Sequence, residues 1–345
     1  MARGWVQPEY TKSKVASAGR RIRKSRATAE DWEVFENWRR SHAYILNTFQ
    51  MRLRRSRNTF VGDVQVAQRH KRRPTIVDKL TREPSMQLPN MHDIAGCRAI
   101  CSSVDDLYEF RSKFLNTRSL HVHTNDEDRF DYIKNPKPSG YRGIHDIFET
   151  VLSSESGSRW NGLKVEIQFR TRAQHAWATA VETVDLLNGE RAKFGQASPK
   201  LQRFFVVASE LIARYAEGVT GPLRGVDDKV VAKEFGKLNR ELGIVRRLGE
   251  AVASNPEIQK DRNTILIFHF EGNTRLEVLS FNSITPAQKM YSELESEMEG
   301  RADIVLVKSQ NAEDLKRAFQ NYFTDATDFV DLVTEAYNSL KQTAA

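Results

Sequence analysis

The sequence contains little cysteine and no long apolar run. Its two cysteines, Cys97 and Cys101, lie in GCRAIC among apolar neighbours, which is typical of buried reduced thiols and argues against a disulfide framework. No window approaches the roughly 18 consecutive apolar residues of a membrane-spanning helix. The opening MARGWVQPEY lacks the apolar segment of a secretory signal. These absences predict a soluble, cytoplasmic protein with no membrane partner.

The sequence also lacks a GxxxxGK(S/T) phosphate loop, which argues against an ordinary P-loop kinase. His70 and His269 have no metal-ligand spacing, so a zinc site is not expected. Binding of a nucleotide would therefore depend on separate cations and carboxylates.

Charge is distributed unevenly along the 345 residues. Residues 1–80 contain 19 Lys and Arg against 7 Asp and Glu, a net +12, whereas residues 251–345 contain 9 against 15, a net −6. A basic front half favours an anionic partner. Charge by itself is compatible with a nucleotide, an RNA or a membrane surface.

Composition and periodicity divide the chain into three parts. Residues 1–28 carry arginines and lysines among Ser, Ala and Gly, which predicts a flexible basic arm. Residues 29–220 alternate apolar strands with amphipathic helices. Glycines flank Pro222 at a plausible boundary, and residues 225–345 read as a long charged helix, a β-hairpin and further α+β elements. The predicted fold class is α+β (α/β), a mixed β-sheet flanked by helices with a small C-terminal α+β domain.

Three segments carry polar groups that packing alone does not require. The first is RHKRRPTIVDKL at 69–80, whose cations suit phosphate oxygens, although a solvated basic turn is the simpler interpretation. In the second, MHDIAGCRAI at 91–100, Asp93 precedes an apolar strand and Arg98 lies inside it. A carboxylate there suits Mg²⁺ shared with phosphates, or a loop cap.

The third segment combines DYIKNPKPSGYRGIH at 131–145 with VEIQFRT at 165–171. Alternation places Glu166, Gln168 and Arg170 on one face of a strand, which is either a site or the wet side of a sheet. Tyr141 follows a loop glycine and suits stacking on a base, or ordinary packing.

In this order and spacing, the segments resemble the synthetase domain of the RelA/SpoT homologues over roughly residues 69–182. The resemblance implies a nucleotidyltransferase-like domain that transfers the β,γ-pyrophosphate of ATP to the ribose 3′-hydroxyl of GDP or GTP, which makes (p)ppGpp and releases AMP. It implies Mg²⁺ as the cofactor. The sequence before Arg69 is too short for the hydrolase domain of the bifunctional relatives, so a synthetase-only member is expected.

The resemblance also assigns roles by position. Asp93 and Glu166 are the expected catalytic and Mg²⁺-binding carboxylates, with Glu166 also activating the acceptor hydroxyl. The expected ATP-binding residues are Arg69, Lys71, Lys79 and Arg98. The expected acceptor-binding residues are Lys137, Tyr141, His145, Gln168 and Arg170.

Some positions depart from the family pattern. Residues 128–131 read Asp-Arg-Phe-Asp where relatives often carry RxKD or ExDD, so GDP and GTP both stay open as acceptors. Ser139 stands at the usual Asn position, and one extra residue separates Lys79 from Asp93.

Other functions and partners stay open. Toxin-like relatives pyrophosphorylate the 3′-CCA end of tRNA, and the basic N-terminal region is compatible with that acceptor. A catalytically inactive nucleotide- or RNA-binding regulator is a third hypothesis, which the presence of Asp93, Tyr141 and Glu166 disfavours. The C-terminal domain is expected to bind the synthetase domain or a regulatory partner, or to pack and form a homo-oligomer.

Overall fold

The computed structural model describes residues 4–188, 197–252, 263–269, 276–298, 302–308 and 327–343. The chain divides into two compact units. The first comprises residues 1–99, 108–130 and 145–169, and the second comprises residues 100–107, 131–144 and 170–345.

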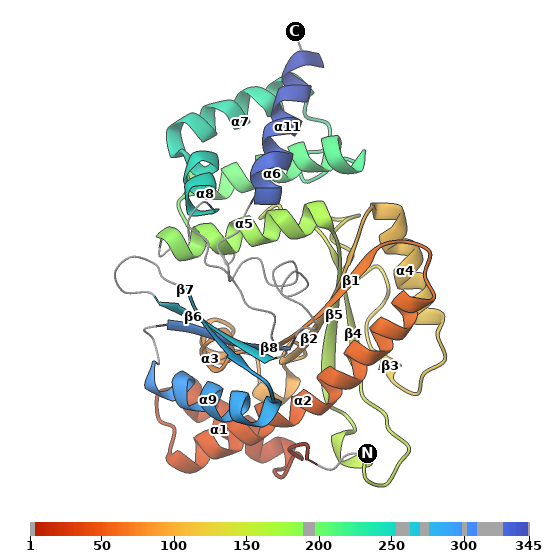
Figure 1. Cartoon of the computed structure of the whole chain (residues 1–345), viewed down its shortest axis with the longest axis vertical. Helices are drawn as coiled ribbons and strands as arrows, with labels where there is room; N and C mark the ends of the chain where they lie inside the picture. Colours follow the sequence, from red (N-terminus) through yellow and green to blue (C-terminus); the bar gives the residue numbers. More distant parts are fainter. Residues whose placement is uncertain are drawn as a thin grey trace. The chain divides into compact units, whose positions relative to one another are not determined.

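A five-stranded sheet with the strand order β1-β2-β5-β4-β3 lies mostly in the first unit, while its residues 100–101, 144 and 170–171 belong to the second (Figure 1). Its strands are β1 (Val64–His70), β2 (Ala95–Cys101), β3 (Val122–His123), β4 (Ile144–Glu149) and β5 (Lys164–Thr171). The helices are α1 (Lys12–Arg23), α2 (Ala29–Asn58), α3 (Arg73–Arg82) and α4 (Val104–Asn116), with the short 3-10 turns η1 (Leu88–Asn90) and η2 (Ser158–Trp160). The expected α+β class, a sheet flanked by helices, is confirmed. Strand β1 was not predicted.

Aromatic side chains join α2 and α4 to the sheet. Phe114 of α4 contacts Phe148 of β4, with ring centroids 5.7 Å apart, and also Phe169 of β5 at 6.2 Å. Phe49 of α2 contacts the same Phe148 at 5.4 Å. All four rings are buried, so burial of this cluster holds the two helices on β4 and β5.

Helix α1 replaces part of the flexible arm that composition predicted. Thr11 caps its first turn, and Val15, Ala18 and Ile22 are buried because α1 packs against α2, α3 and η1. Lys24 and other cations are exposed. The prediction was wrong for residues 12–23 because a narrow apolar stripe separated by basic residues resembles a polar tail in composition while still forming an amphipathic helix.

The segment before α1 is tied to a distant part of the first unit. The Trp160 indole Nε1 donates to the Val6 carbonyl at 3.1 Å, across 154 residues of sequence. Arg159 donates to the Gln7 side chain at 2.7 Å, and Asn37 of α2 donates to the Gln7 carbonyl at 3.0 Å. Residues 6 and 7 are therefore held by both α2 and η2.

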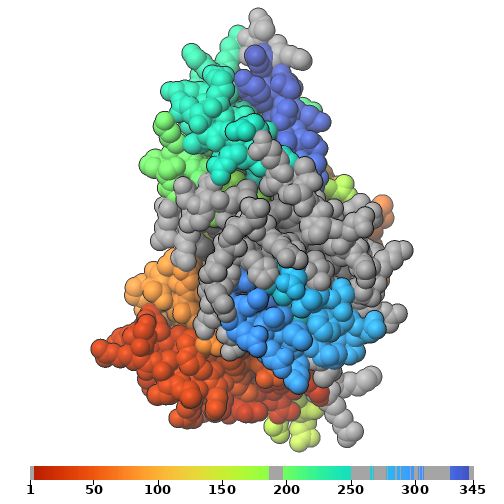
Figure 2. Space-filling model, turned by 60° about the vertical axis from the view of Figure 1, so that its left-hand side comes forward, coloured from red at the N-terminus to blue at the C-terminus, as the bar shows by residue number. Residues whose placement is uncertain are grey.

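The second unit contains a helical cluster. Its helices are α5 (Arg172–Asn188), α6 (Pro199–Glu217), α7 (Asp228–Leu242), α8 (Ile244–Val252) and α11 (Thr327–Thr343), which share one apolar core. Figure 2 shows α7 and α11 side by side, and the two helices pack together. Because α11 also packs on α5 and α6, the chain does not separate at the expected boundary of 220–225.

The long charged helix expected from Asp227 is two helices. Asp227 caps α7, and Gly243 ends it in the left-handed conformation at φ +63°, which costs glycine little because it has no Cβ. The chain then continues as α8.

The expected β-hairpin is confirmed in a three-stranded sheet of order β7-β6-β8. Strands β6 (Asn263–His269), β7 (Leu276–Phe281) and β8 (Ala302–Lys308) are all antiparallel to their neighbours, and α9 (Ile284–Glu297) packs against them. The turn expected at residues 271–273 lies outside the described residues. Within the described ranges, no helix is both long and apolar enough to cross a membrane.

The packing of α1 can be tested with Ile22→Ala. Ile22 is 4% exposed, so we expect the free energy of unfolding to fall by about 2–5 kcal/mol. Lys24→Ala at the exposed C-cap of the same helix is the control and should change the free energy of unfolding by less than about 0.5 kcal/mol. Urea unfolding followed by tryptophan fluorescence measures both, and equal stability of the two variants would mean that residues 12–23 are an arm after all.

Candidate active site

Asp93 lies between η1 and β2 and binds two lysines. Its Oδ2 accepts hydrogen bonds from Lys71 Nζ at 2.7 Å and Lys79 Nζ at 3.1 Å. Lys71 directly follows β1, and its backbone N–H donates to the Ile94 carbonyl at 2.8 Å, which joins the end of β1 to the start of β2. Lys79 comes from α3. The basic segment at 69–80 is therefore folded around Asp93 and is not a solvated turn.

Helix α2 fixes the backbone at Lys71. The buried Arg39 donates through Nε to the Lys71 carbonyl at 2.8 Å. The neighbouring His70 ring bonds the Arg39 carbonyl through Nε2 at 2.7 Å. The ammonium of Lys71 is thus carried on a backbone held by two strands and one helix.

Opposing effects set the ionisation of Asp93 and Lys71. Burial raises the pKa of the Asp93 carboxyl, but Lys71 and Lys79 outweigh both burial and the repulsion of Glu166, so this pKa lies below its usual range. Burial lowers the pKa of Lys71, and Asp93 offsets only part of that effect.

Glu166 is the second carboxylate and lies on β5, only 7% exposed. Gln168 Nε2 donates to its Oε1 at 2.7 Å. His145 Nδ1 of β4 lies 3.5 Å from the same oxygen, and His92 Nε2 lies 3.7 Å from Oε2. Glu166 therefore meets polar groups from its own strand, from β4 and from the segment before β2.

The same neighbours decide the ionisation of Glu166. Burial raises the pKa of this carboxyl, but the His145 charge and hydrogen bonds from His145 and Gln168 outweigh it and hold the pKa below its usual range. The carboxylate is consequently ionised at neutral pH.

The alternation expected along β5 is confirmed, and the polar face of the strand is largely covered as well, with Gln168 half-buried. Val165, Ile167 and Phe169 are fully buried on one face. On the other, Glu166 is 7% and Arg170 is 6% exposed. Covered charged side chains require partners, which favours a site over the solvated side of an antiparallel sheet.

His92 belongs to this cluster, although no role was predicted for it. His92 contacts Glu166. Burial lowers the pKa of His92 below its usual value, and the charges of Glu166 and Asp93 offset only part of that effect. The signal was its position directly before Asp93. We name the following residues the carboxylate cluster: Lys71, Lys79, His92, Asp93, His145, Glu166 and Gln168.

The structure divides the residues expected to bind the acceptor into two groups. His145 and Gln168 contact Glu166 in the first unit. The others gather around tyrosine rings in the second unit: Lys137 Nζ lies 4.2 Å from the Tyr132 ring centroid and 5.2 Å from that of Tyr141. We name this second group the tyrosine cluster, comprising Tyr132, Lys137, Tyr141 and Arg170.

Arg170 fixes the Tyr141 ring in the tyrosine cluster. Its guanidinium carbon lies 5.1 Å from the ring centroid, and its Nε donates to the tyrosine hydroxyl at 3.2 Å. The Tyr132 ring meets Tyr141 edge-on at 5.8 Å. A tyrosine ring beside two cations suits a planar, electron-rich base carrying phosphates. Tyr132 was not predicted, although it is the second aromatic residue of the same motif.

The loop of residues 131–144 carries three of these side chains and is closed by its own backbone. Lys137 N–H donates to the Tyr141 carbonyl at 3.1 Å, and Gly140 N–H donates to the Lys137 carbonyl at 2.8 Å. Asp131 Oδ1 accepts from the backbone N–H groups of Ile133 and Lys134, both at 3.0 Å. The chain therefore turns tightly before Tyr141.

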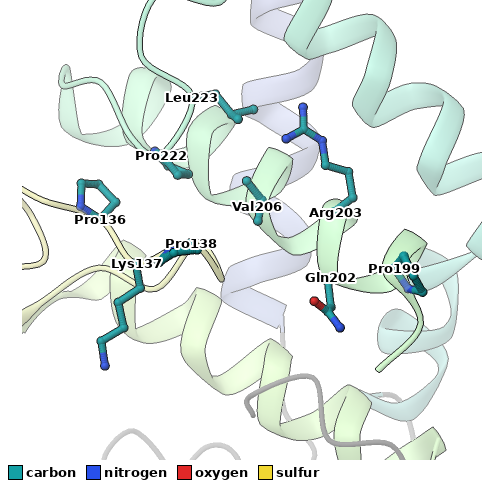
Figure 3. Close-up of a pocket in the computed structure, with 9 residues that line it drawn as sticks. All are labelled: Pro136, Lys137, Pro138, Pro199, Gln202, Arg203, Val206, Pro222 and Leu223. Carbon is teal, nitrogen blue, oxygen red and sulfur yellow. The ribbon is translucent and has the colours of Figure 1, made fainter. Parts of the chain in front are cut away.

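A pocket of about 550 Å³ lies beside this loop (Figure 3). Figure 3 shows the Lys137 side chain extending away from the other labelled side chains. Arg203, also at the pocket, is bound by both oxygens of Glu234 at 2.7 and 2.8 Å. The remaining lining is mostly apolar: Pro136, Pro138, Pro199, Gln202, Val206, Pro222 and Leu223.

Two further predicted residues lie on neighbouring strands. Arg69 lies on β1, and its charge lowers the pKa of Lys71, which places it near the carboxylate cluster. Arg98 lies half-buried on β2. Both cysteines of β2 are buried and are not joined in a disulfide, as expected.

The carboxylate cluster suits a divalent cation that shares its ligands with phosphate. Asp93 Oδ1 is buried and has no hydrogen-bond partner among the described residues, so one oxygen is available as a ligand. Within those residues, no group of three or more His, Cys, Asp and Glu forms a metal cage. Mg²⁺ does not require one, because it keeps waters and takes one or two carboxylates plus substrate phosphates.

The carboxylate cluster, with its lysines, and the tyrosine cluster, with its ring beside cations, each have the chemistry that suits phosphate-bearing ligands. Residues 68–184 match the family model described as the region found in RelA / SpoT proteins. The chain therefore contains a RelA/SpoT region, and the resemblance read from the motifs is confirmed for these residues.

Curated relatives match the same part of the chain. It is 36% identical over 110 residues to the GTP pyrophosphokinase YwaC of Bacillus subtilis (strain 168), covering 30% of this chain and 50% of the relative. It is 36% identical over 107 residues to the GTP pyrophosphokinase YjbM of the same organism, covering 30% and 48%. The chain thus spans about half the length of the curated relatives it matches.

Solved structures of alarmone synthetases are also similar. The small alarmone synthetase 2 from Bacillus subtilis is 27% identical, covers 54% of this chain and 93% of its own, and has a TM-score of 0.42. The small alarmone synthetase 1 from Bacillus subtilis bound to its product pppGpp is 25% identical, covers 62% and 99%, and has a TM-score of 0.45.

The ionisation of Glu166 predicts a pH dependence of stability. A carboxyl with a lowered pKa in the folded chain stabilises it above the unfolded pKa of about 4.3 and loses that effect as pH falls. We therefore expect the stability of the wild type to decrease more steeply from about pH 5 to pH 3 than that of Glu166→Gln. Urea unfolding across this range measures both, with the exposed Glu33→Gln as the control. Parallel curves for wild type and Glu166→Gln would contradict the assigned ionisation.

Proposed function

We propose that this protein is a pyrophosphokinase that transfers the β,γ-pyrophosphate of ATP to the ribose 3′-hydroxyl of GDP or GTP, making (p)ppGpp. The observation that carries the proposal is the carboxylate cluster, with two ionised carboxylates among lysines in the RelA/SpoT region. The matched relatives, which are named GTP pyrophosphokinases, support the same reaction.

The carboxylate cluster is proposed to act at the reacting atoms. The acceptor 3′-oxygen attacks the β-phosphorus of ATP, the bond between the β-phosphorus and the α,β-bridging oxygen breaks, and AMP leaves with that oxygen. Glu166 takes the hydroxyl proton, a role for which an ionised carboxylate is required. Gln168 and His145 orient the Glu166 carboxylate.

Lys71 and Lys79 are proposed to bind the phosphates of ATP together with Arg69 and Arg98. Fixed cations in a site with little water stabilise charge that spreads over phosphate oxygens during transfer. Asp93 and Glu166 would hold Mg²⁺, which supplies neutralisation of polyphosphate charge when bound. Asp93 Oδ1, which has no hydrogen-bond partner within the described part of the chain, supports this assignment.

The tyrosine cluster is proposed to bind the acceptor. Tyr141 offers a ring face for the guanine base, and Lys137 lies within reach of both rings to pair with acceptor phosphates. Loop 131–144 leads directly to His145, and β5 carries both Glu166 and Arg170. The residues proposed for binding and those proposed for chemistry therefore come from the same two stretches of sequence.

Transfer can be tested with γ-labelled ATP and separate acceptors: GDP, GTP and deacylated tRNA. We expect label in a guanine nucleotide, and loss of at least about a thousandfold in rate for Asp93→Asn and Glu166→Gln because base and metal ligand are removed. Glu155→Gln, an exposed carboxylate on another segment, is the control. Label on tRNA alone, or normal turnover in either variant, would overturn the proposal.

The stacking role of Tyr141 predicts a selective effect on the acceptor. Tyr141→Ala should raise the acceptor KM at least about tenfold, corresponding to about 1.4 kcal/mol of binding free energy, with little effect on the KM for ATP. Tyr141→Phe keeps the ring and removes only the hydroxyl that accepts from Arg170, so it should raise the acceptor KM far less, by about threefold. Steady-state kinetics with each substrate varied measures the split, and an unchanged acceptor KM in Tyr141→Ala would reject stacking.

A further inference from the structure

A buried ion pair links the loop of the tyrosine cluster to the end of α6. Arg142 directly follows Tyr141, and its Nη1 pairs with Oε2 of Glu217, the last residue of α6. Both side chains are 2% exposed. Arg142 Nε and Nη2 have no hydrogen-bond partner among the described residues, so the charge of this arginine depends on Glu217 for compensation.

Glu217 also holds the end of β5. Its Oε1 accepts hydrogen bonds from the Thr171 hydroxyl and from Gln174 Nε2, the latter at 2.9 Å. Thr171 directly follows Arg170, the cation that bonds the Tyr141 hydroxyl. One carboxylate therefore binds the residue after Tyr141 and the residue after Arg170, which places both halves of that pair on a common support.

Helix α6 supports the loop at a second point, eight residues earlier in its sequence. Ser209 Oγ donates to the Gly140 carbonyl at 2.7 Å. Gly140 has φ +89°, and a Cβ there would come within 3.0 Å of the Val206 Cα and 3.1 Å of the Phe205 carbonyl. The backbone before Tyr141 thus lies directly against α6, and only glycine fits this approach.

We propose that α6 is the template for the acceptor-binding loop and that Glu217, with Arg142, is a positioning pair that sets the Tyr141 ring for the guanine base. The inference rests on the proposed function, because it takes Tyr141 as the ring that stacks on the acceptor. Ser209 has the same role at Gly140. Ser209 and Glu217 lie outside the RelA/SpoT region of residues 68–184. They act on Tyr141 through its neighbours Gly140 and Arg142.

The physical reason is preorganisation. A ring that stacks on a base contributes most when it is already held in the bound orientation, because no ordering of the loop then opposes binding. Removing the Glu217 charge leaves Arg142 buried and uncompensated, so the loop is expected to shift until that arginine reaches water. Tyr141 would shift with it, and affinity for the acceptor would fall, while the carboxylate cluster keeps its own contacts.

The test compares Glu217→Gln with Glu210→Gln. Glu210 is a matched control because it is a fully buried carboxylate on the same helix, and its described contacts are to Arg214 at 2.6 Å and the Leu223 backbone N–H at 2.6 Å. We expect Glu217→Gln to raise the acceptor KM about tenfold with the KM for ATP changed less than about twofold, whereas Glu210→Gln lowers the unfolding midpoint without moving the acceptor KM. An equal rise in both variants, or none in Glu217→Gln, would overturn the positioning role.

Hydrogen exchange gives a readout that does not require transfer. The loop amides of Lys137 and Gly140 are hydrogen bonded within 131–144, so their exchange reports whether the loop is held. Glu217→Gln should accelerate exchange in this segment at least about tenfold and Glu210→Gln should not. If the wild type transfers to no acceptor but exchange responds in this way, the support of the loop stands and only the proposed function fails. Unchanged exchange in Glu217→Gln would sink the inference itself.

A milder variant covers the case in which Glu217→Gln does not fold. Ser209→Ala keeps the ion pair and removes only the hydrogen bond to the Gly140 carbonyl. We expect a rise of about threefold in acceptor KM and faster exchange at Gly140, both smaller than those for Glu217→Gln because one neutral hydrogen bond is lost. An acceptor KM and an exchange rate equal to wild type would contradict the template role of α6.

Discussion

Burial of the Glu166 carboxylate is the constraint on which the arrangement of the first unit depends. A charged side chain that is buried on a strand loses its hydration, so polar or charged groups of the protein must compensate it. The strand order places β5 between β2 and β4. His92 before β2 and His145 on β4 therefore reach Glu166 from its two neighbours. An order that did not keep β5 between β2 and β4 would separate at least one histidine from the carboxylate, so the topology and the ionisation state are linked.

The same logic explains Asp93. Its two lysine partners come from the end of β1 and from α3, which folding brings to the residue before β2 from 22 and 14 positions earlier in the sequence. Their charge keeps the carboxylate ionised in spite of burial and of the nearby Glu166. A cluster with both signs of charge in one place can accept a polyphosphate with its cation without a large net change in charge, which is the physical advantage of mixing lysines with carboxylates.

Much of the carboxylate cluster could be predicted from the sequence because each residue stands in a motif whose order is visible. Alternation correctly placed Glu166 and Gln168 on one face of β5, yet it gave no sign that this face is covered, because burial on the second face depends on other elements. His92 and Tyr132 escaped prediction for a similar reason, since their roles come from neighbours in space. Composition predicts a flexible arm at residues 12–23 because it does not reveal a narrow apolar stripe. The structure buries that stripe, which consists of Val15, Ala18 and Ile22.

The contacts of residues 6 and 7 have a consequence for biosynthesis. The indole of Trp160 reaches the Val6 carbonyl across 154 residues, so this segment is held by α2 alone until η2 has left the ribosome. Helix α1 needs η1 for the same reason, since Gly19 packs closely on Leu88. Helix α1 can therefore dock once residues up to 90 are available, whereas the contacts of residues 6 and 7 with η2 form later, after most of the five-stranded sheet has been synthesised.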